Sequence, residues 1–431
     1  MTEELANKLL GKLDSRQEQI LQRNLDALLQ VLVGEITTEI VDSEPVDRVV
    51  IHVRDEYRRV SHQHILCANI EMRGVTEAST KHQLIERAAL RLKKAKSQDV
   101  TAFRSILADE VQKYITRKKT QYLVVFPFNV RWPMGSKGRR SVTVLGTRIL
   151  VSSWPALTRR ARVKSWYNDL KLFTRVEQRD PESLMKGIPF VIAIDARHEQ
   201  EAFTSANERF ELWRAALNIA GAAGVFHQQM GGSPRPIGRF RAPRSCGVFA
   251  ASGEYKMFFY DHRYWPPPDP FGIEIPPDVL DGATGLLGHL TKPRSDQDIQ
   301  GLILEGYRKL GAALDTDEWH QGFLELWQIL ELITCRDRSG TFRMDEVRDR
   351  AKRLLCEDPL KIDLLQAAYL TRNRYVHGGS FSDEGMLEFE MLESVVEYCL
   401  TVLSALRRIC PTWHDLELFY SHAGYTYLIS G

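Results

Sequence analysis

A series of helical patterns in the last third of the chain constrains the fold more than any other feature. Apolar residues recur there at helical spacing, and short polar stretches separate one run from the next. The runs cover about residues 295–314, 317–335, 343–355, 360–377 and 384–409. Helices of this length with short connections bury their apolar faces against one another. We therefore expect an all-α antiparallel bundle here, ended by Pro411.

The region before the bundle has a different pattern. A short apolar run at 122–126 predicts a buried strand, and residues 141–151 predict two short strands about Gly146. A further strand is expected at 187–196, followed by a helix at 199–223. A strand that feeds a helix indicates a mixed α/β region. The expected fold class of the whole chain is therefore α+β.

The first hundred residues are predicted to be rich in helix. Residues 2–33 show an amphipathic pattern that fits one long helix or a helical pair broken near Asp14–Ser15. Residues 47–72 alternate more like strands. Helices are expected again at about 81–96 and 102–118.

The length of 431 residues is too great for one ordinary core. The clearest linker signal is the proline-rich stretch 264–270, which favours a stiff, extended connection. We expect a helix-rich N-terminal region at 1–120, a basic α/β domain at 121–264, a linker at 265–289 and the bundle at 290–431.

Candidate catalytic residues gather at the end of one helical run, in the sequence TRNRYVHGG from Thr371 to Gly379. Arg372 and His377 are five residues apart, about 140° of arc and about 7.5 Å of rise on an ideal helix. An uninterrupted helix would not aim both at one point. Gly378 and Gly379 are typical helix-stop residues, so we expect a stop after His377 that lets its ring swing back.

These residue types suit phosphodiester chemistry. The guanidinium of Arg372 offers paired donors to phosphate oxygens, and Asn373 adds an uncharged amide. The imidazole of His377 titrates near neutrality, so it can take or give a proton in the transition state. This chemistry needs neither a metal ion nor another cofactor. The alternative is that Arg372 and His377 only cap and pair within the bundle.

The stretch resembles the Arg-x(4 to 6)-His signature of HEPN-domain ribonucleases, in which Asn, His or Asp commonly follows the arginine. The spacing alone is weak, since Arg59 with His64 and Arg408 with His414 also fit it. The upstream pattern Phe-Leu-x-Leu-Trp-x-x-Leu-Glu at 323–331, followed by Arg-Asn-x-x-Val-His-x-Gly, is similar to the Apea-like HEPN branch. The resemblance covers about the last third of the chain.

The resemblance implies a metal-independent endoribonuclease whose bundles pair as a homodimer. Arg372 and His377 of both copies would share one cleft. Glu331 could orient Arg372, although on its spacing alone it could equally face solvent. Cleavage would leave a 2′,3′-cyclic phosphate and a 5′-hydroxyl. Proteins of this branch often act in antiviral defence, where a toxin-like ribonuclease cuts cellular RNA such as transfer RNA and causes abortive infection. The N-terminal two thirds would then sense a phage-derived or cellular trigger, select the substrate or inhibit the ribonuclease.

The charge distribution indicates where RNA would bind. Residues 290–431 hold 16 Lys and Arg against 23 Asp and Glu, while residues 1–289 hold 42 against 33. A phosphate backbone is better held by the basic part. An edge of arginines interleaved with Trp154, Trp166 and Tyr167 could clamp a backbone and stack a base. The candidate RNA-binding residues are Arg159, Arg160, Arg162, Arg235, Arg239, Arg241, Arg244 and Arg374.

Other signals favour an ordinary intracellular protein. The six cysteines have no paired ligand spacing, so neither a zinc site nor a disulfide framework is expected. The N-terminus lacks a secretion signal and no apolar run is long enough to span a bilayer, so we expect a cytoplasmic protein without a membrane partner. The alternative function is a non-catalytic nucleic-acid-binding or scaffold protein whose bundle only dimerises.

Overall fold

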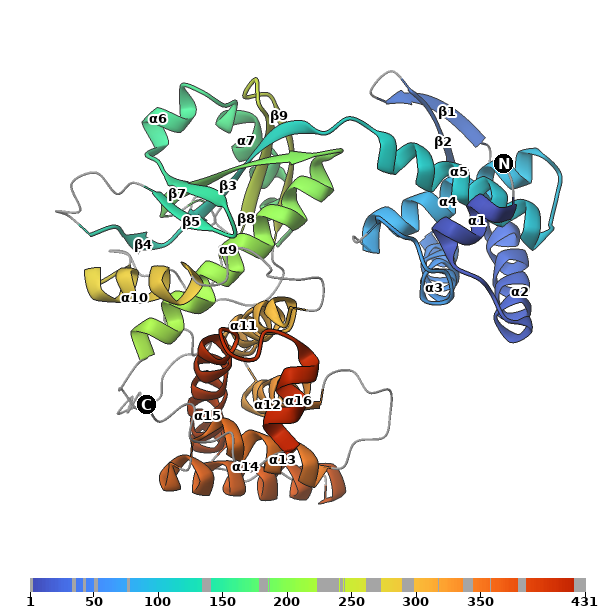
Figure 1. The fold of residues 1–431 in the computed structure, drawn as a ribbon. Coiled ribbons are helices and arrows are strands. Elements are labelled where there is room, and N and C mark those ends of the chain that lie inside the picture. Colours follow the sequence, from blue (N-terminus) through green and yellow to red (C-terminus); the bar gives the residue numbers. More distant parts are fainter. Residues whose placement is uncertain are drawn as a thin grey trace. The chain divides into compact units, whose positions relative to one another are not determined.

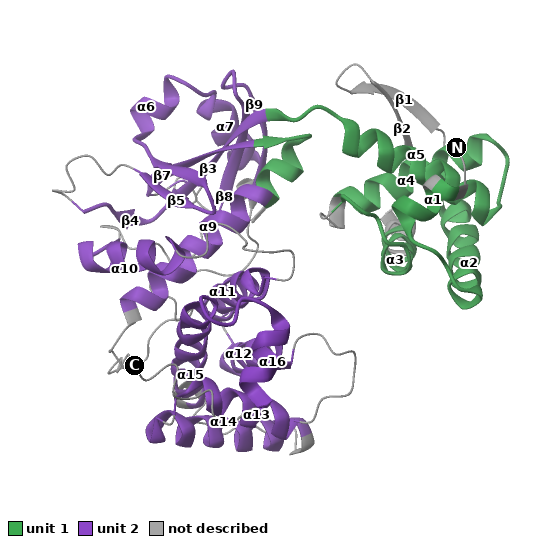
Figure 2. Ribbon diagram, in the orientation of Figure 1, with its two compact units in different colours: residues 1–120, 195–204 green, residues 121–194, 205–431 purple. Residues whose placement is uncertain are grey.

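The chain forms two compact units in the computed structural model, which Figures 1 and 2 show. Unit 1 contains residues 1–120 and 195–204, and unit 2 contains residues 121–194 and 205–431. The described residues are 3–32, 36–41, 44–49, 53–75, 78–133, 141–177, 185, 187–222, 240, 243, 245–260, 273–288, 298–316, 318–335, 344–356, 358–378 and 385–421. Some side chains at the ends of elements, that of His377 among them, lie outside this description.

Unit 1 begins with the helical pair that the sequence pattern allowed. Helix α1 (Glu3–Leu10) and helix α2 (Ser15–Val31) are separated at Asp14. The Asp14 carboxylate accepts the backbone N–H of Gln17 at 2.7 Å, and the Gln17 side chain accepts the N–H of Asp14 at 3.0 Å. This reciprocal capping box satisfies two backbone donors and starts α2. The apolar stripe of α2 is buried in the core of unit 1.

The strand-like reading of 47–72 is wrong for most of that segment. Strands β1 (Ile36–Val41) and β2 (Glu44–Val49) form an antiparallel hairpin, and then helix α3 (Val53–Asn69) follows. Leu66 and Ile70 are buried four residues apart, which is helical spacing. A short alternation of apolar and polar residues fits both the strand period of two and the helical period of about 3.6 residues. No helix-breaking residue interrupts the 17 residues of α3. Helices α4 (Ala78–Lys94) and α5 (Val100–Thr116) lie close to the expected ranges.

A six-stranded sheet lies at the centre of the α/β part of unit 2. Its strand order is β5-β6-β7-β3-β8-β9, and the pairings β5–β6, β6–β7, β3–β8 and β8–β9 are antiparallel. The strands are β3 (Thr120–Phe128), β5 (Ser141–Val144), β6 (Thr147–Val151), β7 (Ile188–Ala196), β8 (Ser245–Ala250) and β9 (Tyr255–Tyr260). Together with the bundle described below, this sheet confirms the α+β class. A smaller parallel pair joins β4 (Val130–Arg131) and β10 (Ile273–Glu274).

Helices cover both faces of this sheet, as the alternation along β3 requires. Val125 packs in a cluster with Trp166 of helix α7 (Val163–Glu177). The next residue, Phe126, points to the opposite face and stacks on Phe210 of helix α9 (Glu199–Ala222), with ring centroids 4.6 Å apart. The short helix α6 (Trp154–Thr158) precedes α7 on the first face.

The C-terminal helices confirm the expected bundle (Figure 1). They are α11 (Gln300–Asp315), α12 (Trp319–Cys335), α13 (Met344–Leu354), α14 (Pro359–Gly378), α15 (Gly385–Leu406) and α16 (Trp413–Ser421). Helix α12 lies in the middle and packs against α11, α13 and α15. The sequence analysis missed α16, although a capping signal marks it, since Thr412 Oγ1 accepts the N–H of Asp415 at 3.2 Å.

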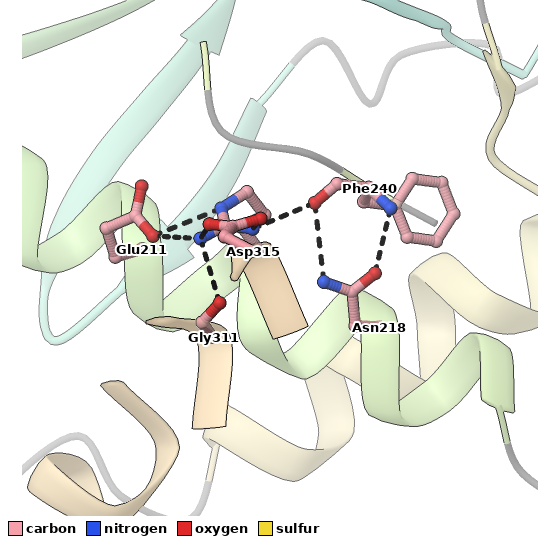
Figure 3. Close-up of polar contacts among 6 residues, drawn as sticks. Glu211, Asn218, Phe240, Gly311 and Asp315 are labelled. Atoms are coloured by element: carbon pink, nitrogen blue, oxygen red, sulfur yellow. Dashed lines mark hydrogen bonds and ion pairs between the residues drawn. The ribbon is translucent and has the colours of Figure 1, made fainter. Parts of the chain in front are cut away.

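A buried ionic network ties the bundle to the sheet layer within unit 2 (Figure 3). Arg214 of α9 is fully buried, and its Nη1 donates to Oδ1 of Asp315, at the end of α11, at 2.8 Å. Arg214 also contacts Glu211 and donates to the carbonyl oxygen of Phe240 at 3.1 Å. Asn218 completes the group, accepting the N–H of Phe240 at 2.8 Å. The basic domain and the bundle are therefore joined by packed helices.

The expected linker range contains a packed helix. Helix α10 (Pro277–Gly288) buries Val279, Leu280, Ala283 and Leu287, so this half of 265–289 is not an open connection. The apolar residues recur at helical spacing after Pro277, which the proline-rich signal upstream obscured. The proline-rich stretch 264–270 lies outside the described residues. No described helix combines the length and apolar character that crossing a bilayer requires.

Candidate functional site

Helix α14 carries the candidate catalytic residues in its last two turns. It begins at Pro359, and the carboxylate of Asp358 accepts the N–H of Lys361 at 3.2 Å, as an N-cap does. The helix continues through His377 and ends at Gly378. The stop expected after His377 is therefore present at Gly378, and the backbone at His377 is still helical.

The buried side of α14 sets the direction of each candidate residue. Leu365, Ala368 and Thr371 are buried where α14 packs on α13 and α15. Arg372 follows Thr371 and is half-buried at the edge of this contact. His377 lies about 140° further around an ideal helix. Because the helix is continuous, its backbone does not bring Arg372 and His377 together within one chain.

Arg372 of α14 and Glu331 of α12 interact electrostatically across two helices. Burial raises the pKa of the Glu331 carboxyl above its ordinary value, while the nearby charge of Arg372 lowers it and offsets part of that rise. The two groups do not form a direct ion pair. The buried indole N–H of Trp327 also lowers this pKa, although it does not reach hydrogen-bond geometry with any described group. Glu331 thus provides a carboxyl that responds to the charge of Arg372.

Tyr369 fixes α14 against its neighbours one turn before Arg372. Its hydroxyl donates to the Asp345 carboxylate of α13 at 2.8 Å, and the Arg348 guanidinium lies 4.9 Å from its ring centre. On the α12 side its ring lies 6.3 Å from that of Trp327. The sequence analysis did not select Tyr369, yet its position three residues before Arg372 places both on one helix side. This spacing of three residues is the sequence signal that could have identified Tyr369 as a neighbour of Arg372.

Arg374, two residues after Arg372, has different interaction partners. Arg374 donates to Thr371 Oγ1 at 3.1 Å and lies 3.6 Å from the Glu388 carboxylate of α15. Thr371 in turn donates to Glu388 at 3.2 Å, although Oε2 of this buried carboxylate has no partner among the described residues. Arg374 remains 66% exposed, so it can still meet a ligand. Asn373, between the two arginines, is half-exposed.

The competing Arg/His spacings occupy different surroundings. Arg59 forms an ion pair with Glu86, and Nδ1 of His64 lies 2.9 Å from Nε2 of His82. His414 is exposed near the start of α16. Neither pair lies on α14, and Arg59 is already paired with the Glu86 carboxylate, so the two histidines serve as controls.

The predicted basic edge is only partly described. Arg159, Arg160 and Arg162 are exposed in the turn between α6 and α7. Trp166 is fully buried in the core beneath them, so the expectation that it stacks a base is wrong. Trp166 lies three residues after the buried Val163 of α7, so both share the core-facing side of that helix. Four candidates lie outside the described residues, namely Arg235, Arg239, Arg241 and Arg244.

Comparisons with protein-family models, with curated proteins and with solved structures find no match to this chain. Among the described residues, no group of three or more His, Cys, Asp or Glu side chains is arranged to hold a metal ion. The six cysteines form no disulfide. The function of the α14 helix end therefore has to be inferred from the chemical groups of its own side chains.

Proposed function

We propose that this chain is a metal-independent endoribonuclease of the HEPN type, acting through the end of α14. The observation that carries the proposal is the position of Arg372, a half-exposed cation beside the raised-pKa carboxyl of Glu331. The same helix presents His377 about one and a half turns further on. An arginine and a histidine near the end of one helix suit the attack of a ribose 2′-hydroxyl on its own phosphate when two copies of the helix meet.

The reaction would proceed by transfer within the substrate. His377 accepts the proton of the 2′-hydroxyl as its oxygen forms a bond to phosphorus. Arg372 and the Asn373 amide stabilise the charge that develops on the phosphorane oxygens. The bond from phosphorus to the 5′-oxygen breaks, and that oxygen takes a proton. The products are a 2′,3′-cyclic phosphate and a 5′-hydroxyl end.

A second copy of the bundle would complete the site. The continuous α14 keeps Arg372 and His377 of one chain apart, whereas Arg372 of one copy and His377 of the other could face one phosphate across a two-fold axis. Leu370 and Val376, exposed by 52% and 51% on α14, would be covered in such a contact. Light scattering should then detect a homodimer, and only monomers under active conditions would exclude the composite site.

The biological setting is the one that the resemblance to the Apea-like HEPN branch implies. We propose that the protein cuts cellular RNA such as transfer RNA in the cytoplasm during antiviral defence. Unit 1 and the sheet of unit 2 would sense the trigger or regulate the ribonuclease. Arg159, Arg160, Arg162 and Arg374 would hold the RNA backbone through their exposed guanidinium groups. An active form would arrest growth of its own cell.

The scaffold alternative also has an observation in its favour. Arg374 is bound to Glu388 and Thr371, so one arginine of the motif does stabilise the bundle. If Arg372 and His377 had only this kind of role, the bundle would dimerise or bind nucleic acid without cutting it.

Cleavage assays on the purified protein test the proposal. We expect His377→Ala and Arg372→Ala each to abolish most RNA cleavage, with losses far from additive because both residues act on one phosphate. Folding should persist, because truncation of a side chain near a helix end costs less than truncation in a core. Activity should survive a chelator and leave cyclic-phosphate ends.

The matched controls are His64→Ala and His414→Ala, which should cleave like the wild type. Normal cleavage by His377→Ala, or a reaction stopped by the chelator, would show that the proposal is wrong.

A further inference from the structure

The turn between α6 and α7 borders a hollow that the proposed catalytic site does not use. The hollow has a volume of about 310 Å³. Residues 158–162 of the turn line one side, and residues 252–254 of the β8–β9 hairpin line the other. Three of these residues are arginines, Arg159, Arg160 and Arg162.

The walls of the hollow are held by backbone contacts. The N–H of Arg162 donates to the carbonyl oxygen of Gly253 at 2.9 Å, and the N–H of Gly253 donates to that of Ala250 at 2.8 Å. Gly253 has a φ of +83°, and a Cβ there would lie 1.8 Å from the carbonyl oxygen of Arg160. Only glycine permits this approach of two backbones. The hollow is therefore formed before any ligand arrives.

Buried apolar residues next to the arginines in the sequence hold the arginine side chains at the surface. Leu157, Ala161 and Val163 belong to the core cluster under the sheet face that α7 covers. Arg160 and Arg162 alternate with these anchors and are exposed. Because the anchors fix the turn, the guanidinium groups stay near the hollow.

The arginines have no counter-ion within the described part of the chain. None of the three forms an ion pair with a described residue, and only the Nε of Arg159 is taken, donating to the carbonyl oxygen of Pro155 at 3.3 Å. Of the lining residues only Glu254 is acidic, and Lys256 lies 3.2 Å from its carboxylate. Neighbouring like charges repel, so a multivalent anion would relieve this cluster.

We propose that the hollow binds the phosphate monoester of a nucleotide, either the phosphorylated end of a nucleic-acid chain or a free mononucleotide. A monoester carries nearly two charges at neutral pH, whereas a backbone diester carries one. Guanidinium groups pair with phosphate oxygens through two parallel hydrogen bonds. The volume is at the small end of ligand pockets, which suits one nucleotide better than an extended peptide.

This binding does not depend on Arg372 or His377. If the proposed ribonuclease function is also correct, the hollow would hold one end of its RNA. The two ideas can fail separately, because binding can be measured on RNA that cannot be cut.

Fluorescence anisotropy of the full chain with 2′-O-methyl oligonucleotides tests the proposal, since these lack the attacking hydroxyl. Oligonucleotides with a 5′-phosphate, a 3′-phosphate or only hydroxyl ends are compared. We expect one phosphorylated end to bind about tenfold more tightly than the hydroxyl form, the effect of one added charge-assisted contact. Inorganic phosphate should compete for the site.

Two variants with matched controls locate the effect. The double change Arg160→Gln and Arg162→Gln should remove the preference for a phosphorylated end, while Lys164→Gln, which removes an exposed charge outside the lining, should keep it. Gly253→Ala keeps every charge but should also remove the preference, because it moves the wall beside Arg160.

The competitors distinguish the two sources. Stronger competition by a mononucleotide than by a phosphorylated oligonucleotide supports a free nucleotide, and the reverse supports a chain end. Equal binding of phosphorylated and hydroxyl ends by the wild type, or a preference that survives the double change, would overturn the proposal. Competition by phosphoserine equal to that by a mononucleotide would overturn the assignment to a nucleotide.

Discussion

At the residue scale, the environment of Glu331 links the candidate site to a measurable property. Its pKa is raised by burial and lowered by Arg372 and by Trp327. A carboxyl with a raised pKa favours its protonated form in the folded protein, so its contribution to stability is present at low pH and is lost as pH rises through the folded pKa. The nearby positive charge reduces that loss.

Removal of Arg372 should therefore change the titration of Glu331. We expect Arg372→Ala to raise the pKa of Glu331 further, because burial then acts with less opposition. Arg374→Ala is the matched control, since Arg374 pairs with Glu388 and not with Glu331. NMR titration of carbon-13-labelled carboxyl groups measures both. An unchanged Glu331 titration in Arg372→Ala would show that the two helices are not coupled through this pair.

At the scale of the element, helix α15 carries buried carboxyl groups whose surroundings disfavour the ionised form. Burial and the charge of Glu390 raise the pKa of Glu393 from 4.5 to about 8, and burial with the charge of Glu393 raises that of Glu397 well above its ordinary value. The Oε1 atom of Glu397 is buried without a hydrogen-bond partner among the described residues. Burial therefore favours the protonated, neutral form of both side chains.

The bundle should lose stability as this helix ionises. Between pH 4.5 and about 8 the folded chain holds a proton at Glu393 that the unfolded chain has released, so the free energy of unfolding falls across this window. Glu393→Gln cannot ionise and should flatten that fall, whereas Glu318→Gln, at an exposed position, should leave it as in the wild type. Urea unfolding at pH 6 and pH 9 measures the difference. An equal fall in Glu393→Gln and the wild type would contradict a protonated Glu393.

At the scale of the whole molecule, each unit has its own core, and unit 2 joins a sheet layer to a helical bundle. The join includes the buried pair of Arg214 and Asp315, of which Asp315 is 1% exposed. A buried pair contributes little by itself, but loss of one partner leaves an uncompensated charge in the core. The stability of the bundle and of the sheet layer should therefore be coupled.

Loss of one partner measures that coupling. Arg214→Met should lower the free energy of unfolding of unit 2 by roughly 3–5 kcal/mol, because Asp315 is left buried without its cation. Arg308→Met is the control on α11, since Arg308 pairs with Glu305 at the surface and its loss should cost at most about 1 kcal/mol. Denaturant unfolding compares the two variants. Equal losses would show that the buried pair does not join the two layers.

The sequence by itself determined most of the elements. Apolar periodicity and the glycine at the β5–β6 turn are local signals, and they predicted strands β3, β5, β6 and β7 and the main bundle helices, but not strands β8 and β9. Local signals failed where two periods overlap, as in α3, and where a short helix follows a proline, as in α16. The candidate residues Arg372, Glu331 and His377 also came from the sequence.

Only the tertiary structure decided which of these residues meet. The approach of Arg372 to Glu331 depends on how α12 and α14 pack, whereas the end of α14 at Gly378 follows the local glycine signal. Segments distant in the sequence also come together to bury Trp166, to pair Arg214 with Asp315 and to form the hollow beside Gly253. Sequence patterns report the free energy of local structure, whereas these features depend on burial and on charges brought together by the fold.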